Sequence, residues 1–275
     1  MRIINQRFID DLLTGELSFF LSEVKRPELE LCIEIRGGYI NIYHRGGSLL
    51  KITQKRTGYQ FHFDARYCLN KGDDSNFNLL NGLSPKDRSA YIQYFHLMME
   101  EMDSWLDKHI KPEREYQHQL IRSNPSVVDI EYALSLTKDG QRSSMRLDML
   151  AVDNGQLVII ENKYGEKAMT GSSGFSDHYE DICAIIKEPT IYQEMVASVK
   201  AILSCKRALG LPITKCDLDE TLPPRILFFL ANYNDRSQTL NNEVRQLTRE
   251  YPAEVLFLKD SYIIDFGNAK SLFDL

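Results

Sequence analysis

Two acidic residues and a lysine lie close together in the middle of the chain, on either side of a tight-turn signal. Asp148 lies in an apolar run that ends at Asn154-Gly155. Glu161 and Lys163 close the apolar run that follows. An Asn-Gly pair between two apolar runs predicts a β-hairpin, and residues two apart on a strand share a face. Two carboxylates beside a lysine could bind a divalent cation between them.

The register of this hairpin decides how close the two carboxylates come. Counting outward from the turn, Asp153 pairs with Gln156 and Asp148 pairs with Glu161. Opposed residues on neighbouring strands have Cβ atoms about 5 Å apart, where like charges destabilise each other. A divalent cation and the Lys163 ammonium group would supply the missing positive charge. The alternative is an ordinary Glu/Lys pair at an exposed strand end.

A helix and a further strand are expected before the hairpin. Residues 113–122 have a helical pattern that stops at Asn124-Pro125, and an apolar run over 127–136 follows. Glu113 shares an i, i+3, i+4, i+7 stripe with Leu120, which predicts that it faces the sheet. The alternative is a glutamate that only favours the helix dipole. The other side of the helix is predicted to be a polar face, made of Glu115, His118, Gln119 and Arg122.

Asp148 followed by Glu161-Asn162-Lys163 resembles the signature of the PD-(D/E)xK nuclease superfamily. The order of helix, hairpin and third strand is also that family's core order. The likeness covers residues 113–233, with Leu147 where the family name has proline. It implies an α/β restriction-endonuclease-like core, in which a mixed sheet is flanked by helices.

The resemblance implies a role for each of these residues. Asp148, Glu161 and the backbone carbonyl of Asn162 would hold Mg²⁺, for which Mn²⁺ can substitute, and Glu113 would be a third acid at this metal or at a second one. Lys163 would orient the attacking water or neutralise charge in the transition state. The implied activity is that of an endonuclease, a hydrolase acting on the phosphodiester bonds of DNA.

A role in restriction or anti-phage defence is implied by analogy alone. The helix spacing Glu-x3-Gln-x2-Leu-x3-Asn-Pro, from Glu113 to Pro125, resembles nuclease domains of bacterial anti-phage systems. The alternative function is a catalytically inactive nuclease-fold protein that binds nucleic acid or serves as a scaffold. A net charge of −6 favours that alternative, because an acidic chain does not attract nucleic acid by its overall field. The intact Asp148, Glu161 and Lys163 favour the enzyme.

Three features after the hairpin have more than one interpretation. The Gly171–Gly174 loop is either a flap over the site or a linker. The stretch from His178 to Asp181 predicts a helix start, but it could also supply a ligand or contact substrate. Tyr192 and Gln193 lie on a later helix, where relatives often place a supporting polar residue. The remaining expected elements are helices over 177–187, 191–209 and 238–250, and strands over 225–233, 254–258 and 262–266.

Residues 1–110 are expected to form a separate α+β domain, joined at Lys111-Pro112 to the nuclease-like domain over 111–275. Short alternating runs separated by glycine pairs predict an antiparallel meander over 29–63. A polar loop over 71–82 and one long helix from Pro85 to His109 are expected to follow.

The meander segment is basic and aromatic. Between Cys32 and Lys71 there are seven lysines and arginines against two acids. One interpretation is a nucleic-acid surface that uses phosphate contacts and stacking. The other is a module for a partner protein or a homo-oligomer, whose aromatics pack against the long helix. The rings concerned are Tyr39, Tyr43, His44, Tyr59, Phe61 and Phe63.

Nothing in the sequence predicts export or a membrane span. The N-terminus has no apolar segment followed by a small-residue cleavage site. The longest purely apolar run, 226–231, is far shorter than the ~20 residues of a membrane helix. Five cysteines without a Cys-x-x-Cys pair signal neither a disulfide framework nor a structural zinc site. These features predict a cytoplasmic protein with reduced cysteines.

Overall fold

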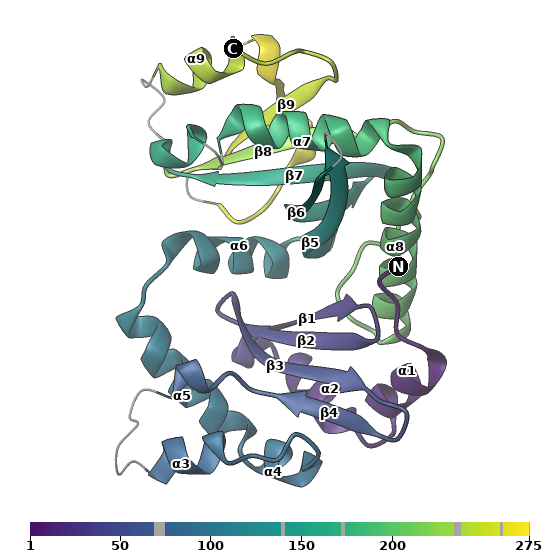
Figure 1. Cartoon of the computed structure of the whole chain (residues 1–275), viewed down its shortest axis with the longest axis vertical. Coiled ribbons are helices and arrows are strands. Elements are labelled where there is room, and N and C mark those ends of the chain that lie inside the picture. The colour runs from purple at the N-terminus through teal and green to yellow at the C-terminus, as the bar shows by residue number, and fades with distance from the viewer. Residues whose placement is uncertain (69–74, 139–140, 172–173, 234–237, 259–260, 275) are drawn as a thin grey trace. The chain divides into compact units, whose positions relative to one another are not determined.

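The computed structural model describes residues 1–68, 75–138, 141–171, 174–233, 238–258 and 261–274 (Figure 1). These residues form two compact units. The N-terminal unit comprises Arg2–Arg122 and Ser204–Leu211, and the C-terminal unit comprises Met1, Ser123–Leu203 and Pro212–Leu275. Two expected features lie partly outside the described residues: residues 71–74 of the polar loop, and Ser172 and Ser173 of the Gly171–Gly174 loop.

The N-terminal unit contains the expected meander. Its sheet has the strand order β1-β2-β3-β4 with every neighbouring pair antiparallel. The strands are β1 (Leu31–Arg36), β2 (Tyr39–His44), β3 (Gly47–Gln54) and β4 (Tyr59–His62). The helices are α1 (Gln6–Leu13), α2 (Ser18–Val24), α3 (Ser75–Asn81), α4 (Arg88–Gln93), α5 (Phe95–Lys108) and α6 (Pro112–Ser123), and short 3-10 turns cover Pro27–Leu29 and Ala65–Tyr67.

Two expectations for this unit are wrong. The polar loop over 71–82 contains the helix α3. The single long helix is two helices, α4 and α5, which are separated at Tyr94. The backbone of Tyr94 leaves the helical range, with φ −102° and ψ 12°, so the second helix starts in a new direction.

The aromatic rings of the meander are mostly in the core and not on a stacking surface. Tyr43, Tyr59, Phe61 and Phe63 are each no more than 8% exposed. Tyr59 contacts Phe8 of α1 with ring centroids 4.8 Å apart, and Phe61 stacks on Tyr91 of α4 at 5.1 Å. The interpretation in which these rings would stack on bases is therefore wrong for the four buried rings. Packing against helices describes them instead.

Several basic residues of the same segment are already in ion pairs. Arg36 is buried beside Glu34, with 3.8 Å between Nη1 and Oε2. Arg45 pairs with carboxylates of α5 and α6, and Arg66 pairs with Asp64. Lys55 and Arg56 are exposed. The local excess of positive charge in the sequence is thus partly neutralised by residues that are distant along the chain.

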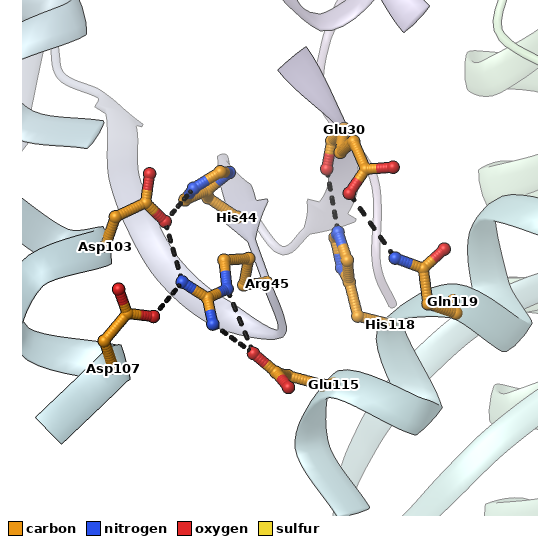
Figure 2. Close-up of polar contacts among 8 residues, drawn as sticks. All are labelled: Glu30, His44, Arg45, Asp103, Asp107, Glu115, His118 and Gln119. Carbon is orange, nitrogen blue, oxygen red and sulfur yellow. Dashed lines mark hydrogen bonds and ion pairs between the residues drawn. The ribbon is translucent and has the colours of Figure 1, made fainter. Parts of the chain in front are cut away.

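The contacts divide the chain between Arg122 and Ser123, which is later than the expected boundary at Lys111. The reason is the side of α6 that the sequence predicts to be a polar face. Arg45 Nε donates to Glu115 Oε1 at 3.0 Å, and His118 Nε2 donates to the backbone oxygen of Glu30 at 2.8 Å (Figure 2). His118 is only 2% exposed. This face therefore attaches α6 to the N-terminal unit.

The C-terminal unit is built on a mixed six-stranded sheet flanked by helices. The strand order is β10-β9-β8-β7-β6-β5; β7, β8 and β9 are parallel, and the other neighbouring pairs are antiparallel. The strands are β5 (Val127–Lys138), β6 (Gln141–Asp153), β7 (Gln156–Tyr164), β8 (Arg225–Ala231), β9 (Ala253–Leu258) and β10 (Lys270–Ser271). The helices are α7 (Phe175–Lys187), α8 (Pro189–Ala208) and α9 (Thr239–Val244), with 3-10 turns at η3 (Glu166–Met169), Phe266–Asn268 and Leu272–Asp274. The end of α8, from Ser204 on, belongs to the N-terminal unit.

The expected strand over 262–266 is absent from the described residues, and the last strand is β10 instead. The main chain of this segment is hydrogen-bonded to the side chain of Asn124 and not to a neighbouring strand. Asn124 Nδ2 donates to the backbone oxygen of Tyr262 at 2.6 Å, and Asn124 Oδ1 accepts from the Ile264 N–H at 2.7 Å. Among the described helices, none is long and apolar enough to cross a membrane.

Candidate active site

The hairpin that carries the candidate residues has the predicted turn and register. Asn154 and Gly155 have φ values of 48° and 84°, the left-handed backbone that a two-residue hairpin turn requires. β6 and β7 then pair from Asp153↔Gln156 to Met149↔Ile160. The next position in the same register places Asp148 opposite Glu161.

The main-chain ladder between β6 and β7 ends one step before these two residues. There the Asp148 side chain takes over, because its Oδ2 accepts from the Asn162 N–H at 2.8 Å. On its other side, β7 continues to pair with β8 as far as Tyr164↔Ala231. Asp148 therefore lies where β6 and β7 part, with its carboxylate directed at the main chain of β7.

Three consecutive polar residues at this end of β7 are buried. Glu161, Asn162 and Lys163 are 0%, 3% and 3% exposed, although Glu161 and Lys163 carry charge. Burying charge is costly unless it is compensated. The alternative of an exposed strand end with an ordinary Glu/Lys pair is therefore wrong, since all three side chains belong to the interior.

The electrostatic environment of Asp148 shows which charges gather here. Burial and the neighbouring Glu161 carboxylate raise the pKa of Asp148 to about 7. The hydrogen bond from the Asn162 N–H and the charges of Lys163 and His178 act in the opposite direction. A carboxyl with a raised pKa beside a second carboxylate marks a place that lacks positive charge. Such perturbed groups cluster at functional sites.

Glu161 is held from the helix side by His178. Phe175 at the start of α7 stacks on Phe228 of β8 with 4.3 Å between ring centroids, and Phe228 is the β8 partner of Glu161. His178 lies three residues further on, so it shares that face of α7. Its Nδ1 is 2.7 Å from Glu161 Oε2. Figure 1 shows α7 lying along this part of the sheet.

Buried polar atoms without a hydrogen-bond partner concentrate in the same stretch of the chain. Among the described residues, six of the eight such side-chain atoms belong to residues 161–176. They are both carboxylate oxygens of Glu161, both amide atoms of Asn162, Glu166 Oε1 and Ser176 Oγ. Neither Glu161 oxygen has a hydrogen bond of good geometry, so the approach of His178 Nδ1 to Oε2 is a close polar contact only. Buried polar groups are normally hydrogen-bonded, so this stretch is unusual in having several buried polar atoms that could still bind a ligand.

The residue types present fit a divalent cation. Asp148 and Glu161 supply carboxylate oxygens, and the Asn162 main chain supplies a carbonyl oxygen, which are the ligands of a hard cation. The buried oxygens of Glu161 without a hydrogen-bond partner are what such an ion would satisfy. In the described part of the chain, however, no three His, Cys, Asp or Glu side chains gather as a ready-made metal centre.

The structure gives different places to the other expected residues. Glu113 is exposed at the start of α6, in the N-terminal unit. Its role as a third acid stays a prediction. Tyr192 is half-buried and Gln193 is exposed on α8, and their supporting role also stays a prediction. His178 lies in the first turn of α7, which begins at Phe175, slightly before the expected start, and it contacts the site as well.

Glu166 and Ser176 are the residues that the sequence does not single out. Their buried atoms depend on how η3 and α7 return onto the sheet after β7, which no local pattern encodes.

Comparison of the chain with family models, with curated proteins and with solved structures finds no match.

Proposed function

We propose that the C-terminal unit is a metal-dependent nuclease of the PD-(D/E)xK type that hydrolyses phosphodiester bonds of DNA. One observation carries the proposal: Glu161 is fully buried where β6 and β7 part, close enough to Asp148 to raise its pKa, with the buried Lys163 two residues further on the same strand. A stable fold has little reason to bury the Glu161 carboxylate, whose oxygens have no hydrogen-bond partner among the described residues, unless something such as a cation completes it.

Each side chain has a defined part in this reaction. Asp148, Glu161 and the Asn162 carbonyl would hold Mg²⁺ or Mn²⁺, which when bound supplies Lewis-acid and water-activating chemistry. Lys163 is a compact positive charge on the same face as Glu161, so it would orient the attacking water or neutralise charge that develops on the phosphate. Burial of these groups strengthens their electrostatic effect, because little water screens them.

The biological role in restriction or phage defence rests on the resemblance alone. Base stacking does not support nucleic-acid binding by the N-terminal unit, because most aromatic rings of its meander are in the core. Contact with a partner protein or a second copy of the chain remains a proposal for that unit. An inactive nuclease-fold scaffold is the competing function, and the acidic net charge of −6 still favours it.

The decisive experiment is cleavage of supercoiled plasmid DNA by the full chain, with Mg²⁺ or Mn²⁺ against EDTA. The test variants are Asp148→Asn, Glu161→Gln and Lys163→Met. Matched controls change exposed residues of the same unit to the same new types: Asp177→Asn, Glu180→Gln and Lys167→Met. Metal-dependent cutting that falls by about 100-fold or more in the test variants, but not in the controls, would support the proposal.

Other outcomes would correct the proposal in different ways. Cutting that survives all three test substitutions would mean that another site, or a contaminant, is responsible. Metal-dependent cutting of RNA but not DNA would keep the site and change the substrate. No cutting of either nucleic acid would favour the inactive scaffold.

A further inference from the structure

We infer that His178 is a positioning residue for Glu161: it holds the carboxylate by Oε2 and thereby directs Oε1 toward a divalent cation. The inference rests on the proposed function and adds a residue that the nuclease signature does not contain. It starts from the 2.7 Å approach of His178 Nδ1 to Glu161 Oε2 and from the lack of a hydrogen-bond partner of good geometry for either Glu161 oxygen among the described residues.

His178 is well placed to fix another side chain, because α7 is itself fixed at its first turns. Phe175 is fully buried and stacks on Phe228. Tyr179, next to His178, is also fully buried; its hydroxyl donates to the backbone oxygen of Tyr251 at 2.7 Å and accepts from the Tyr251 N–H at 2.8 Å. The histidine therefore extends from a rigid support, which a residue that orients a ligand requires.

The two ends of the contact differ in exposure, and this indicates which residue serves the other. The Glu161 side chain is fully buried, whereas that of His178 is 25% exposed. A histidine needs no glutamate at a partly exposed helix start, but a fully buried carboxylate needs a partner. Carboxylates that ligate metals are commonly held by a second polar group, whose loss costs about 10–100-fold in metal affinity or activity.

The atom that makes the contact leads to a sharp test. Asparagine places its side-chain nitrogen the same number of bonds from the main chain as His Nδ1. Glutamine places its nitrogen one bond further out, as His Nε2 does. If Nδ1 positions Glu161, His178→Asn should keep the function while His178→Gln and His178→Ala lose it.

The measurement is Mn²⁺ binding to the full chain by isothermal titration calorimetry, with Glu180→Ala as an exposed control on the same helix. His178→Ala and His178→Gln should weaken binding by about 10–100-fold, and His178→Asn by much less. In plasmid cleavage, His178→Ala should need correspondingly more Mn²⁺ but approach wild-type kcat at saturation. A purely structural role would instead lower thermal stability in all three variants without this order.

Each alternative result decides the matter. Wild-type Mn²⁺ affinity in His178→Ala, or equal losses in the Ala and Asn variants, would overturn the inference and leave the nuclease proposal intact. If the wild type binds Mn²⁺ but cuts no nucleic acid, the proposed function fails while the binding series still tests His178. If the wild type binds no Mn²⁺, both fail.

Discussion

Each unit buries one strand glutamate almost completely, and the two are compensated very differently. Glu34 on β1 and Glu161 on β7 are 1% and 0% exposed. Both oxygens of Glu34 accept from Lys206 Nζ at 3.0 Å. The oxygens of Glu161 have no hydrogen bond of good geometry among the described residues, and His178 Nδ1 approaches Oε2 to 2.7 Å.

The difference separates a buried carboxylate that is paired within the chain from one whose oxygens have no hydrogen-bond partner among the described residues. A buried carboxylate with an ammonium group on both oxygens is complete within the chain. A buried carboxylate with spare oxygens destabilises the fold that carries it, and it is retained where something outside the chain completes it. The N-terminal unit thus uses its buried charges for its own stability, and the C-terminal unit keeps an incomplete group.

The largest expected effect comes from removing the partner of the complete group. Lys206→Met should destabilise the N-terminal unit by about 3–5 kcal/mol, because it leaves a buried carboxylate without its ammonium partner. Urea unfolding measures this. Lys200→Met, on the same helix but exposed and paired with Glu220, should cost no more than about 1 kcal/mol. If both variants lose the same free energy of unfolding, Lys206 does not compensate Glu34 as inferred, and the contrast between Glu34 and Glu161 fails.

The next effect is a pH dependence that belongs to the incomplete group. Burial and Glu161 raise the pKa of Asp148 to about 7 from the ordinary value of 3.8, so the folded chain favours the protonated acid. That contribution to stability is full below pH 3.8 and is lost as the pH rises through about 7. In EDTA, the wild type should lose about 3 kcal/mol relative to Asp148→Asn between pH 5 and pH 8.

Urea unfolding across this pH range gives the comparison directly. Asp177→Asn, an exposed substitution in α7, should keep the pH dependence of the wild type. Should Asp148→Asn follow the wild-type curve at every pH, the carboxyl would not be carrying the unfavourable charge inferred for it.

The sequence predicts the structure best where short-range chemistry determines it. The Asn154-Gly155 dipeptide encodes its own turn, and the turn determines the register that brings Asp148 opposite Glu161. The glycine pairs of the meander work in the same way. At Gly46, where φ is 74°, an added Cβ would also lie 2.5 Å from the Arg114 backbone oxygen, so this turn needs glycine twice over.

The predictions that are wrong depend on contacts between distant parts of the chain. Periodicity places Glu113 on one face of α6 and His118 on another, but it does not say which face is covered. The bonds to Glu30 and Arg45 decide that, and these residues lie far back in the sequence. Likewise, alternation puts Tyr59, Phe61 and Phe63 on one side of a strand, and only the fold shows that helices cover that side.

A smaller effect is expected from neutralising the incomplete glutamate itself. Glu161→Gln should stabilise the metal-free chain by about 2–3 kcal/mol at neutral pH, because an amide is less costly to bury than a poorly compensated carboxylate. Glu34→Gln should do the opposite, since it leaves the Lys206 ammonium buried with a weaker partner. Thermal unfolding of the two variants in EDTA should therefore shift in opposite directions. Destabilisation in both would show that Glu161 is as well compensated as Glu34.

The smallest expected effect is a pH dependence of the N-terminal unit with the opposite sign. Burial lowers the pKa of His118 to about 4, although its bond to the Glu30 carbonyl works the other way. The folded chain therefore favours neutral histidine, so this contribution is full above pH 6.5 and is lost as the pH falls toward 4. His118→Gln keeps a donor for the Glu30 carbonyl but cannot titrate. Between pH 7 and pH 5 the wild type should lose about 1–2 kcal/mol relative to His118→Gln in urea unfolding. If the two curves stay parallel while Asp148→Asn diverges from the wild type, the pH dependence of this protein belongs to the incomplete group alone.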